Sequence, residues 1–293
     1  MLIDTHTHIS SMLGFVMMEE MVLEMIDKYN ISYLILSNAD SAEYDHDQKP
    51  IPLEYQISQK DTFAKSIRFA RENPGKIGIM PWVKPATETA DETLERMIKD
   101  NLDIVKGIKM HAYHSKTATD DDRMIPYVEL AQKYDLPVLI HTGNGQYDSV
   151  YRVYNMAKRY PEVKFILGHM GLGTDNKEAV HLLGCADNLY GDTAWVPMET
   201  TIEVIKKYGS KRMVFGSDSP IDGVDTYVTN GYGEPSMYRK YFEELEGIIG
   251  KEAYEDLMYK NAIELFKIKE VGETKNPGAA TVSVETKNSG EMS

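Results

Sequence analysis

The sequence predicts a (β/α)8 barrel, in which eight parallel strands close into a ring and a helix follows each strand. Eight short apolar runs recur along the chain, and most segments between them carry apolar residues at helical spacing. The runs start about 24 to 44 residues apart, which suits parallel strands joined by crossover helices. No glycine-rich phosphate fingerprint follows the first run, which counts against the alternative, an open doubly wound sheet.

The predicted strands are continuous apolar runs rather than alternating ones, as expected for strands buried on both faces. They are Leu2–Asp4, Tyr33–Ser37, Ile77–Pro81, Gly107–Met110, Pro137–His141, Val163–His169, Leu189–Asp192 and Met213–Ser217. Helices are predicted over Met17–Tyr29, Thr62–Asn73, Thr93–Leu102, Ile125–Tyr134 and Thr201–Tyr208, with two more after the last strand, at about 236–249 and 251–266. Residues 1–268 are therefore expected to form one barrel. Residues 269–293 are polar and are predicted to be a disordered tail.

Composition excludes several classes of partner. The 293 residues include 32 Lys and Arg and 46 Asp and Glu, for a net charge of −14, so nucleic acid and anionic membranes are poor partners. The single cysteine, Cys185, cannot form an intramolecular disulfide. The first residues lack a basic start and an apolar core, and no apolar run reaches the roughly 20 residues of a membrane helix. A cytoplasmic location and a small-molecule substrate are expected.

Candidate metal ligands gather at predicted strand ends. His6 and His8 follow the first apolar run and, being two residues apart, point to the same face of a strand. Neutral imidazole is a good ligand for zinc. His141 closes the fifth predicted strand, His169 closes the sixth, and Asp218 follows the eighth. Because barrel enzymes take their catalytic groups from such ends, these five side chains are expected to share one site.

With these residues in view, the pattern IDTHTH, GIKMH, LIHTG, ILGHMG and FGSDSP resembles the amidohydrolase superfamily. The resemblance is closest to the branch that includes small metal-dependent hydrolases and aminocarboxymuconate-semialdehyde decarboxylase, and it covers residues 1 to about 268. It implies that His6, His8, His141 and Asp218 bind a metal. It also implies that Asp218 and His169 handle protons, or that His169 binds a second metal. Many barrels of this branch are dimers, so the resemblance implies a homodimer.

The resemblance leaves the number of metal ions open. Lys109 matches a lysine that is carbamylated and bridges two ions in two-metal members of the superfamily. One Zn²⁺ is expected here, with Mn²⁺ as an alternative ion and two ions with a carbamylated Lys109 as the less favoured arrangement. With one ion, Lys109 and His111 would face the substrate or move protons.

The outer residues of the site are less sharply defined by sequence. Trp195 follows the seventh predicted strand and is a candidate wall of the substrate pocket. His46 is interpreted as a surface-loop residue and His114 as part of a solvated loop.

Three functions compete. The favoured one is a hydrolase of a small amide, lactone or ester, in which a metal-bound hydroxide attacks a carbonyl. The alternative is a decarboxylase of a small aromatic or unsaturated acid on the same site. No arginine is clearly placed at the rim to hold a carboxylate, which favours hydrolysis. A catalytically silent barrel is disfavoured because all the implied ligands are present.

Overall fold

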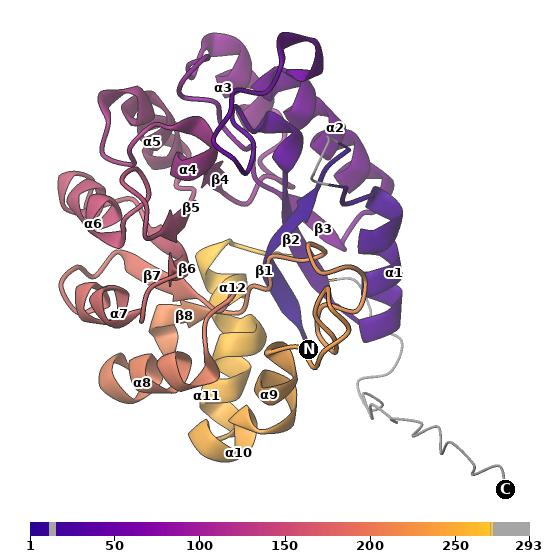
Figure 1. Ribbon diagram of the computed structural model, residues 1–293, viewed down its shortest axis with the longest axis vertical. Helices are drawn as coiled ribbons and strands as arrows, with labels where there is room; N and C mark the ends of the chain where they lie inside the picture. The colour runs from indigo at the N-terminus through magenta and orange to yellow at the C-terminus, as the bar shows by residue number, and fades with distance from the viewer. Residues whose placement is uncertain (12–15, 270, 272–293) are drawn as a thin grey trace, which may run out of the picture.

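The computed structural model describes residues 1–11, 16–269 and 271, and it confirms the predicted barrel. Strands surround a central axis and helices form the outer layer (Figure 1). The strands are β1 (Ile3–Ile9), β2 (Tyr33–Asn38), β3 (Ile77–Ile79), β4 (Ile108–Met110), β5 (Val138–Gly143), β6 (Phe165–Leu172), β7 (Leu189–Asp192) and β8 (Met213–Val214). All the pairings between them are parallel.

The helices fill the segments between the strands and after the last one. They are α1 (Glu19–Tyr29), α2 (Gln59–Glu72), α3 (Glu92–Lys99), α4 (Ala112–Ser115), α5 (Ile125–Tyr134), α6 (Val150–Arg159), α7 (Lys177–Leu183), α8 (Met198–Tyr208), α9 (Tyr238–Glu243), α10 (Leu245–Ile249), α11 (Lys251–Glu255) and α12 (Asn261–Leu265), with a π-helical segment at Asp256–Lys260. None of the helices in the described ranges is long and apolar enough to cross a membrane.

Backbone hydrogen bonds close the ring at its two seams. The strands form one sheet in the order β1-β2-β3 and another in the order β4 to β8. At the first seam, Thr5 N donates to Phe215 O at 3.0 Å and His8 N donates to Ser219 O at 2.8 Å. At the second, Lys109 N donates to Pro81 O at 2.9 Å. The carboxyl ends of all eight strands therefore surround one opening.

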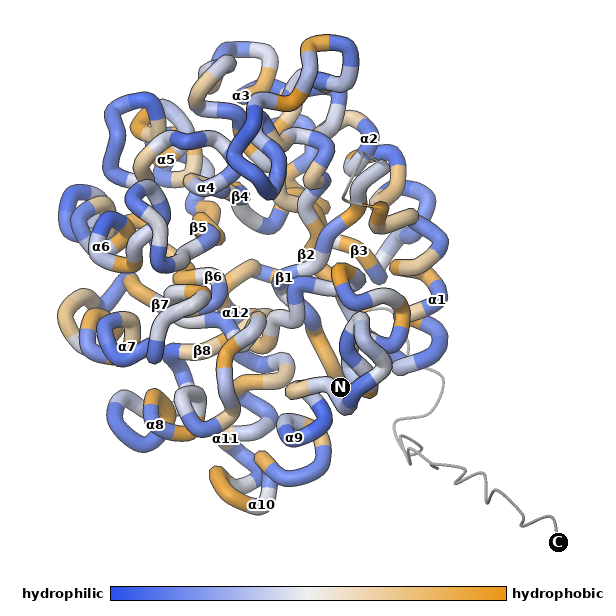
Figure 2. Tube along the Cα trace, viewed as in Figure 1, coloured by the Kyte–Doolittle hydropathy of each residue, from blue (hydrophilic) through white to orange (hydrophobic). Residues whose placement is uncertain are grey.

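Two hydrophobic layers stabilise the barrel. The larger lies between the strands and the outer helices. The smaller fills the barrel interior, where Ile3, Ile35 and Ile166 pack with Leu265 and Phe266 at the end of α12. Figure 2 shows the hydrophobic segments concentrated on the strands and on helix turns, with hydrophilic segments around the outside. The interior layer fills the amino-terminal half of the barrel, so polar side chains at the other end stand on a packed base.

Several predicted boundaries were wrong. β1 continues to Ile9 instead of ending at Asp4, because it pairs with β2 as far as Asn38 and with residues 215–219 after β8. The sequence analysis missed α6, although its buried residues Val150, Val153, Met156 and Ala157 follow helical spacing. The helix predicted at 236–249 is broken at Glu244 into α9 and α10. The tail predicted at 269–293 lies outside the described residues except for positions 269 and 271.

Candidate metal centre

The strand ends bring together the residues that the sequence singled out. His6 and His8 lie on β1, Lys109 on β4, His141 on β5 and His169 on β6, and Asp218 follows β8. All six side chains are buried. A cavity of about 430 Å³ opens above them, and His8, His141, His169, Trp195 and Asp218 form part of its lining. The predicted site residues therefore meet at the carboxyl end of the barrel.

Hydrogen bonds fix the orientation of His6. Its Nδ1 donates to Asp192 Oδ2 at 2.6 Å, so Nε2 is left as the acceptor. Nε2 lies 2.6 Å from Lys109 Nζ and 3.3 Å from Asp218 Oδ1. Burial lowers the pKa of His6 well below its ordinary value, so the ring is neutral. A carboxylate behind an imidazole is the usual support of a metal-binding histidine.

His8 is oriented by different partners. Its Nδ1 lies 3.0 Å from the hydroxyl oxygen of Ser37, which can donate to it, and 3.3 Å from the carbonyl oxygen of the same residue. Its Nε2 faces Asp218 Oδ1 at 2.9 Å. Burial lowers the pKa of His8 as well. Two neutral imidazole nitrogens thus converge on one oxygen of Asp218.

Asp218 remains ionised in this surrounding. Burial alone would raise the pKa of its carboxyl, but the hydrogen bond with His8 and the nearby rings of His169 and His6 hold it well below its usual range. Its second oxygen, Oδ2, accepts a hydrogen bond from Trp195 Nε1 at 2.9 Å. The two oxygens therefore differ, because Oδ1 faces the imidazoles and Oδ2 faces the indole.

His169 and His141 complete the cluster. His169 Nδ1 donates to Ala194 O at 3.1 Å, and burial lowers the pKa of this ring to about 3, which leaves its Nε2 as a free lone pair. His141 Nε2 lies 3.4 Å from Asp148 Oδ2, whereas its buried Nδ1 has no hydrogen-bond partner among the described residues. An unsatisfied buried nitrogen costs free energy and is a sign of a missing ligand.

The donor set fits a divalent cation. Ligand atoms of His6, His169 and Asp218 lie within 4.8 Å of one another, and His8 Nε2 lies 2.9 Å from the Asp218 carboxylate. His6 Nε2 and Asp218 Oδ1 face each other at 3.3 Å as two acceptors, and such a pair repels unless a cation neutralises it. His, Asp and an open coordination position suit a catalytic zinc or manganese ion. His169 belongs to this group of three possible ligands, although the sequence analysis gave it a role in proton transfer first.

Backbone strain is concentrated at the same place. His169, Trp195 and Asp218 all adopt the left-handed conformation, with φ angles of 68°, 56° and 61°. This region costs an L-amino acid about 1–2 kcal/mol. Residues outside glycine adopt it mainly where surrounding contacts enforce it, and such positions cluster at functional sites.

Lys109 lies below the cavity rather than in its wall. Its side chain is fully buried, and burial lowers the pKa of its ammonium group to about 8. Its Nζ contacts His6 Nε2 at 2.6 Å, so it belongs to the base of the cluster.

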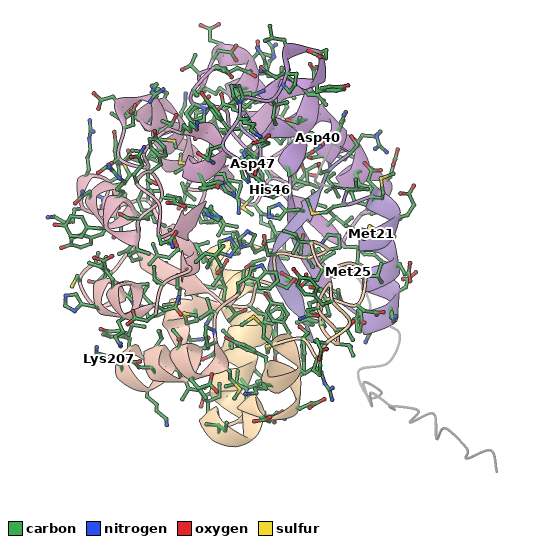
Figure 3. All side chains as sticks on the ribbon, viewed as in Figure 1. Met21, Met25, Asp40, His46, Asp47 and Lys207 are labelled. Atoms are coloured by element: carbon green, nitrogen blue, oxygen red, sulfur yellow. The ribbon has the colours of Figure 1, made fainter. Side chains whose placement is uncertain are left out.

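Flat rings form one wall of the cavity. His111 stacks on Trp82 with ring centroids 4.8 Å apart and on His141 at 3.9 Å. His111 therefore lines the cavity, and its predicted contact with substrate stays a prediction. His46 lies in an exposed turn, as the sequence indicated, and it also lines the cavity. The interpretation of His114 as part of a solvated loop was wrong, since His114 lines the cavity and is only 5% exposed. His114 is turned inward because its Nδ1 bonds Tyr44 O at 2.7 Å, and Figure 3 shows His46 near the centre of the barrel mouth.

Comparison with solved structures supports the fold. The chain resembles 2,6-dihydroxybenzoate decarboxylase from Rhizobium, with 16% identity, a TM-score of 0.62 and coverage of 91% of this chain and 98% of that one. It resembles 5-carboxyvanillate decarboxylase from Novosphingobium aromaticivorans with bound manganese, with 11% identity, a TM-score of 0.65 and coverage of 91% and 97%. It also resembles a probable 2-pyrone-4,6-dicarboxylic acid hydrolase from Acinetobacter baumannii, with 11% identity, a TM-score of 0.60 and coverage of 91% and 99%.

A search of curated protein sequences found no match. At identities below 20%, the structural likeness shows the fold. A family model described as Amidohydrolase matches residues 3–268, which is nearly the whole chain. The ligand-bearing strand ends and the barrel both lie within that match. The chain belongs to the amidohydrolase family.

Proposed function

We propose that this protein is a metal-dependent decarboxylase of a small aromatic acid. The observation that carries the proposal is the cavity, where a histidine and aspartate cluster lies at the base of a wall of stacked rings. A flat aromatic body can pack against Trp82 and His111 while its carboxylate reaches the cluster. Two of the three solved structures described above are decarboxylases of aromatic acids, which supports this reaction over the hydrolysis that the sequence favoured.

His6, His8, His141, His169 and Asp218 are the residues proposed to hold the ion. When bound, a divalent cation supplies a positive charge against which the substrate carboxylate is oriented and polarised. Mn²⁺ and Zn²⁺ both suit the mixed nitrogen and oxygen donors.

The remaining chemistry is proton delivery. Breaking the bond between the ring carbon and the carboxylate leaves the electron pair on that carbon, and a proton must replace the carbon dioxide that departs. Asp218, which follows β8, and His169 on β6 face the same space, and Asp218 can carry this proton after taking it from substrate or solvent. His169 can do so only when it is not a ligand of the ion, because Ala194 O already accepts from its other nitrogen. Trp195 Nε1 holds Asp218 Oδ2, which leaves Oδ1 facing the cluster.

The sequence analysis favoured hydrolysis because no arginine was placed to hold a carboxylate. A metal ion at the cluster would supply the positive charge that an arginine would otherwise provide. None of the described residues that line the cavity is arginine or lysine. The cluster is therefore the proposed site of positive charge for the carboxylate that is lost. Hydrolysis remains the second candidate, because the same ion and Asp218 could activate water and because one similar structure carries a hydrolase name.

A substrate panel separates the two reactions. Purified protein should release carbon dioxide from hydroxylated benzoic acids and leave a panel of esters, lactones and amides intact. Hydrolysis of the second panel without carbon dioxide release from any acid would instead establish the hydrolase.

We expect about one metal ion per chain by elemental analysis of the purified protein. Chelation should remove activity, and adding Mn²⁺ or Zn²⁺ back should restore it, because the ion is proposed to orient and polarise the substrate carboxylate. Two ions per chain would restore the arrangement with a carbamylated Lys109. Full activity with no bound metal would contradict the proposed mechanism.

Replacing Trp195 with phenylalanine should lower kcat about tenfold, since a hydrogen bond to an ionised carboxylate is lost while the ring remains. Trp195→His, which keeps a ring nitrogen as donor, should recover part of the loss. Steady-state kinetics at saturating metal measure both variants. If the phenylalanine variant changed only KM, Trp195 would be a pocket wall and would not position Asp218.

A further inference from the structure

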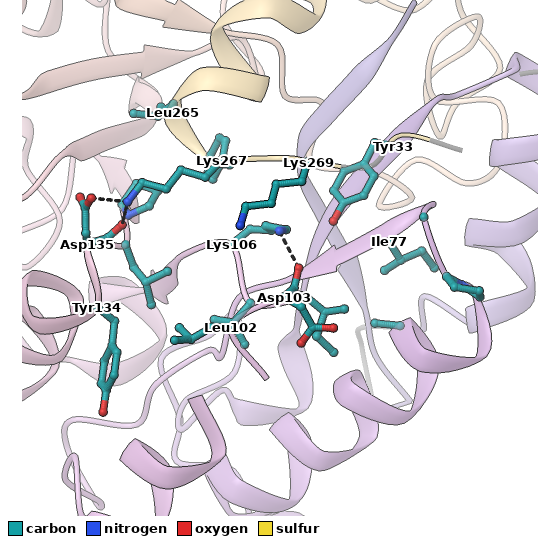
Figure 4. Close-up of a pocket in the computed structure, with 18 of the residues that line it drawn as sticks. Tyr33, Ile77, Leu102, Asp103, Lys106, Tyr134, Asp135, Leu265, Lys267 and Lys269 are labelled. Atoms are coloured by element: carbon teal, nitrogen blue, oxygen red, sulfur yellow. Dashed lines mark hydrogen bonds and ion pairs between the residues drawn. The ribbon is translucent and has the colours of Figure 1, made fainter. Parts of the chain in front are cut away.

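A second cavity lies at the opposite end of the barrel. It measures about 560 Å³ and shares no lining residue with the cavity above the candidate metal centre. Its walls come from the starts of β2 and β3, from the turns before β4 and β5, and from the end of α12, as Figure 4 shows. Active sites of barrels occupy the carboxyl end of the strands, so the chemistry of the candidate metal centre does not explain this cavity.

The cavity carries an excess of positive charge. Four cations line it, Arg71, Lys106, Lys267 and Lys269, against two carboxylates, Asp103 and Asp135. Both carboxylates already have cationic partners. Arg71 Nη2 donates to Asp103 Oδ1 at 2.8 Å, and Lys267 Nζ contacts Asp135. Lys106 and Lys269 are left without a carboxylate partner in the described ranges, in a chain whose net charge is −14.

Lys106 is the less expected of these two cations. Its side chain is only 6% exposed, and its Nζ donates to a neutral acceptor, the carbonyl oxygen of Asp103, at 2.7 Å. Burial lowers the pKa of Lys106, the nearby Asp103 carboxylate raises it in part, and the charge of Lys269 lowers it again. Figure 4 shows both amino groups within the same cavity. Buried charges are normally paired, and no carboxylate of the described residues forms an ion pair with the buried Lys106, so an anion between Lys106 and the exposed Lys269 would offset both charges.

A neutral donor and an apolar surface complete the cavity. The Tyr33 hydroxyl makes no hydrogen bond with another described residue and points into the cavity in Figure 4. Gly78 makes room for this arrangement, because a Cβ there would lie 2.7 Å from Tyr33 Oη and 2.6 Å from Lys106 Cγ. Leu102, Leu136 and Phe266 supply apolar walls. Such a surface suits a ligand with an apolar body.

We propose that this cavity binds a small organic anion, with its carboxylate or phosphate head between Lys106 and Lys269 and its apolar body against the adjoining walls. Tyr33 Oη donates a further hydrogen bond to the head. The site is separate from the candidate metal centre, so the proposal does not depend on the reaction that the centre catalyses.

Calorimetric titration of the full chain with phenyl phosphate tests the site. Lys106→Met and Lys269→Met keep an apolar stem and remove the ammonium group, and each should weaken binding about tenfold, the size of one lost charge-assisted hydrogen bond. Lys207→Met on α8 makes the same charge change at an exposed position far from the cavity (Figure 3) and should bind like the unmodified protein.

Two further comparisons make the result decisive. Inorganic phosphate should bind more weakly than phenyl phosphate, and equal affinities would overturn the role of the apolar walls. Unchanged affinity in both lysine variants, or loss of binding in Asp218→Asn instead, would place the anion elsewhere and overturn the site. Because Lys269 is exposed, its variant remains informative even if Lys106→Met unfolds.

Discussion

Asp218→Asn is expected to abolish turnover while the barrel stays folded. The carboxylate Oδ1 lies 2.9 Å from His8 Nε2 and 3.3 Å from His6 Nε2, and asparagine keeps the shape but removes the negative charge. An asparagine also cannot accept and return the proton that decarboxylation requires. Loss of a group that acts both on the metal and on the proton should reduce kcat by roughly a thousandfold or more.

The measurement is kcat at saturating Mn²⁺, with metal content and the circular dichroism spectrum recorded for the same sample. Asp222→Asn is the matched control, since it makes the same charge change four residues away in the same loop, on a side chain outside the lining of the cavity. Its activity should stay close to that of the unmodified protein. Equal losses of kcat in the two variants would mean that activity depends on the total charge of this loop and that Asp218 has no specific role.

The sequence predicted the barrel well because burial on both faces leaves a clear pattern. The strand Leu189–Asp192 was predicted with the bounds that the structure shows, and β5 and β6 overlap their predicted runs closely. β1 was the exception. Its apolar run was predicted to end at Asp4, yet hydrogen bonds from both neighbouring strands keep the polar residues up to His8 extended. Because the site residues in β1 are polar, a search for apolar runs does not find the end of this strand.

The outer site could not be predicted because it depends on how long loops fold. His46 and Tyr44 belong to the long connection between β2 and α2, and His114 faces the cavity only because Tyr44 O holds its ring. No local pattern in the sequence encodes that contact. Trp82 lies just beyond the short strand β3, where its stacking on His111 depends on the spacing of two strands. Such contacts arise only when segments distant in sequence are brought together.

Asp192 is different, because a signal for its role was present. It closes the seventh strand in the same way that His141 and His169 occupy the ends of theirs. Its Oδ2 accepts from His6 Nδ1 at 2.6 Å, and its Oδ1 accepts from the backbone nitrogens of His169 at 2.8 Å and Ala194 at 3.2 Å. One carboxylate thus positions two proposed ligands from two strands.

Asp192→Asn should therefore weaken metal binding by about 10- to 100-fold, the usual cost of losing the partner behind a metal-binding histidine. Asparagine has one acceptor oxygen, and the two backbone amides compete for it. Its amide nitrogen then faces His6 Nδ1, which must become an acceptor, so the ring proton moves to Nε2. That proton occupies the lone pair that faces Asp218 and the proposed ion.

Titration of the metal-free variant with Mn²⁺ measures this effect without reference to turnover. Excess Mn²⁺ should recover much of kcat, because Asp192 orients a ligand and does not touch the reacting atoms. Asp187→Asn, an exposed carboxylate just before β7, supplies the matched control and should bind Mn²⁺ normally. Unchanged affinity in Asp192→Asn would show that His6 does not bind through Nε2, and the ligand set would then need His8, His141 and His169 without it.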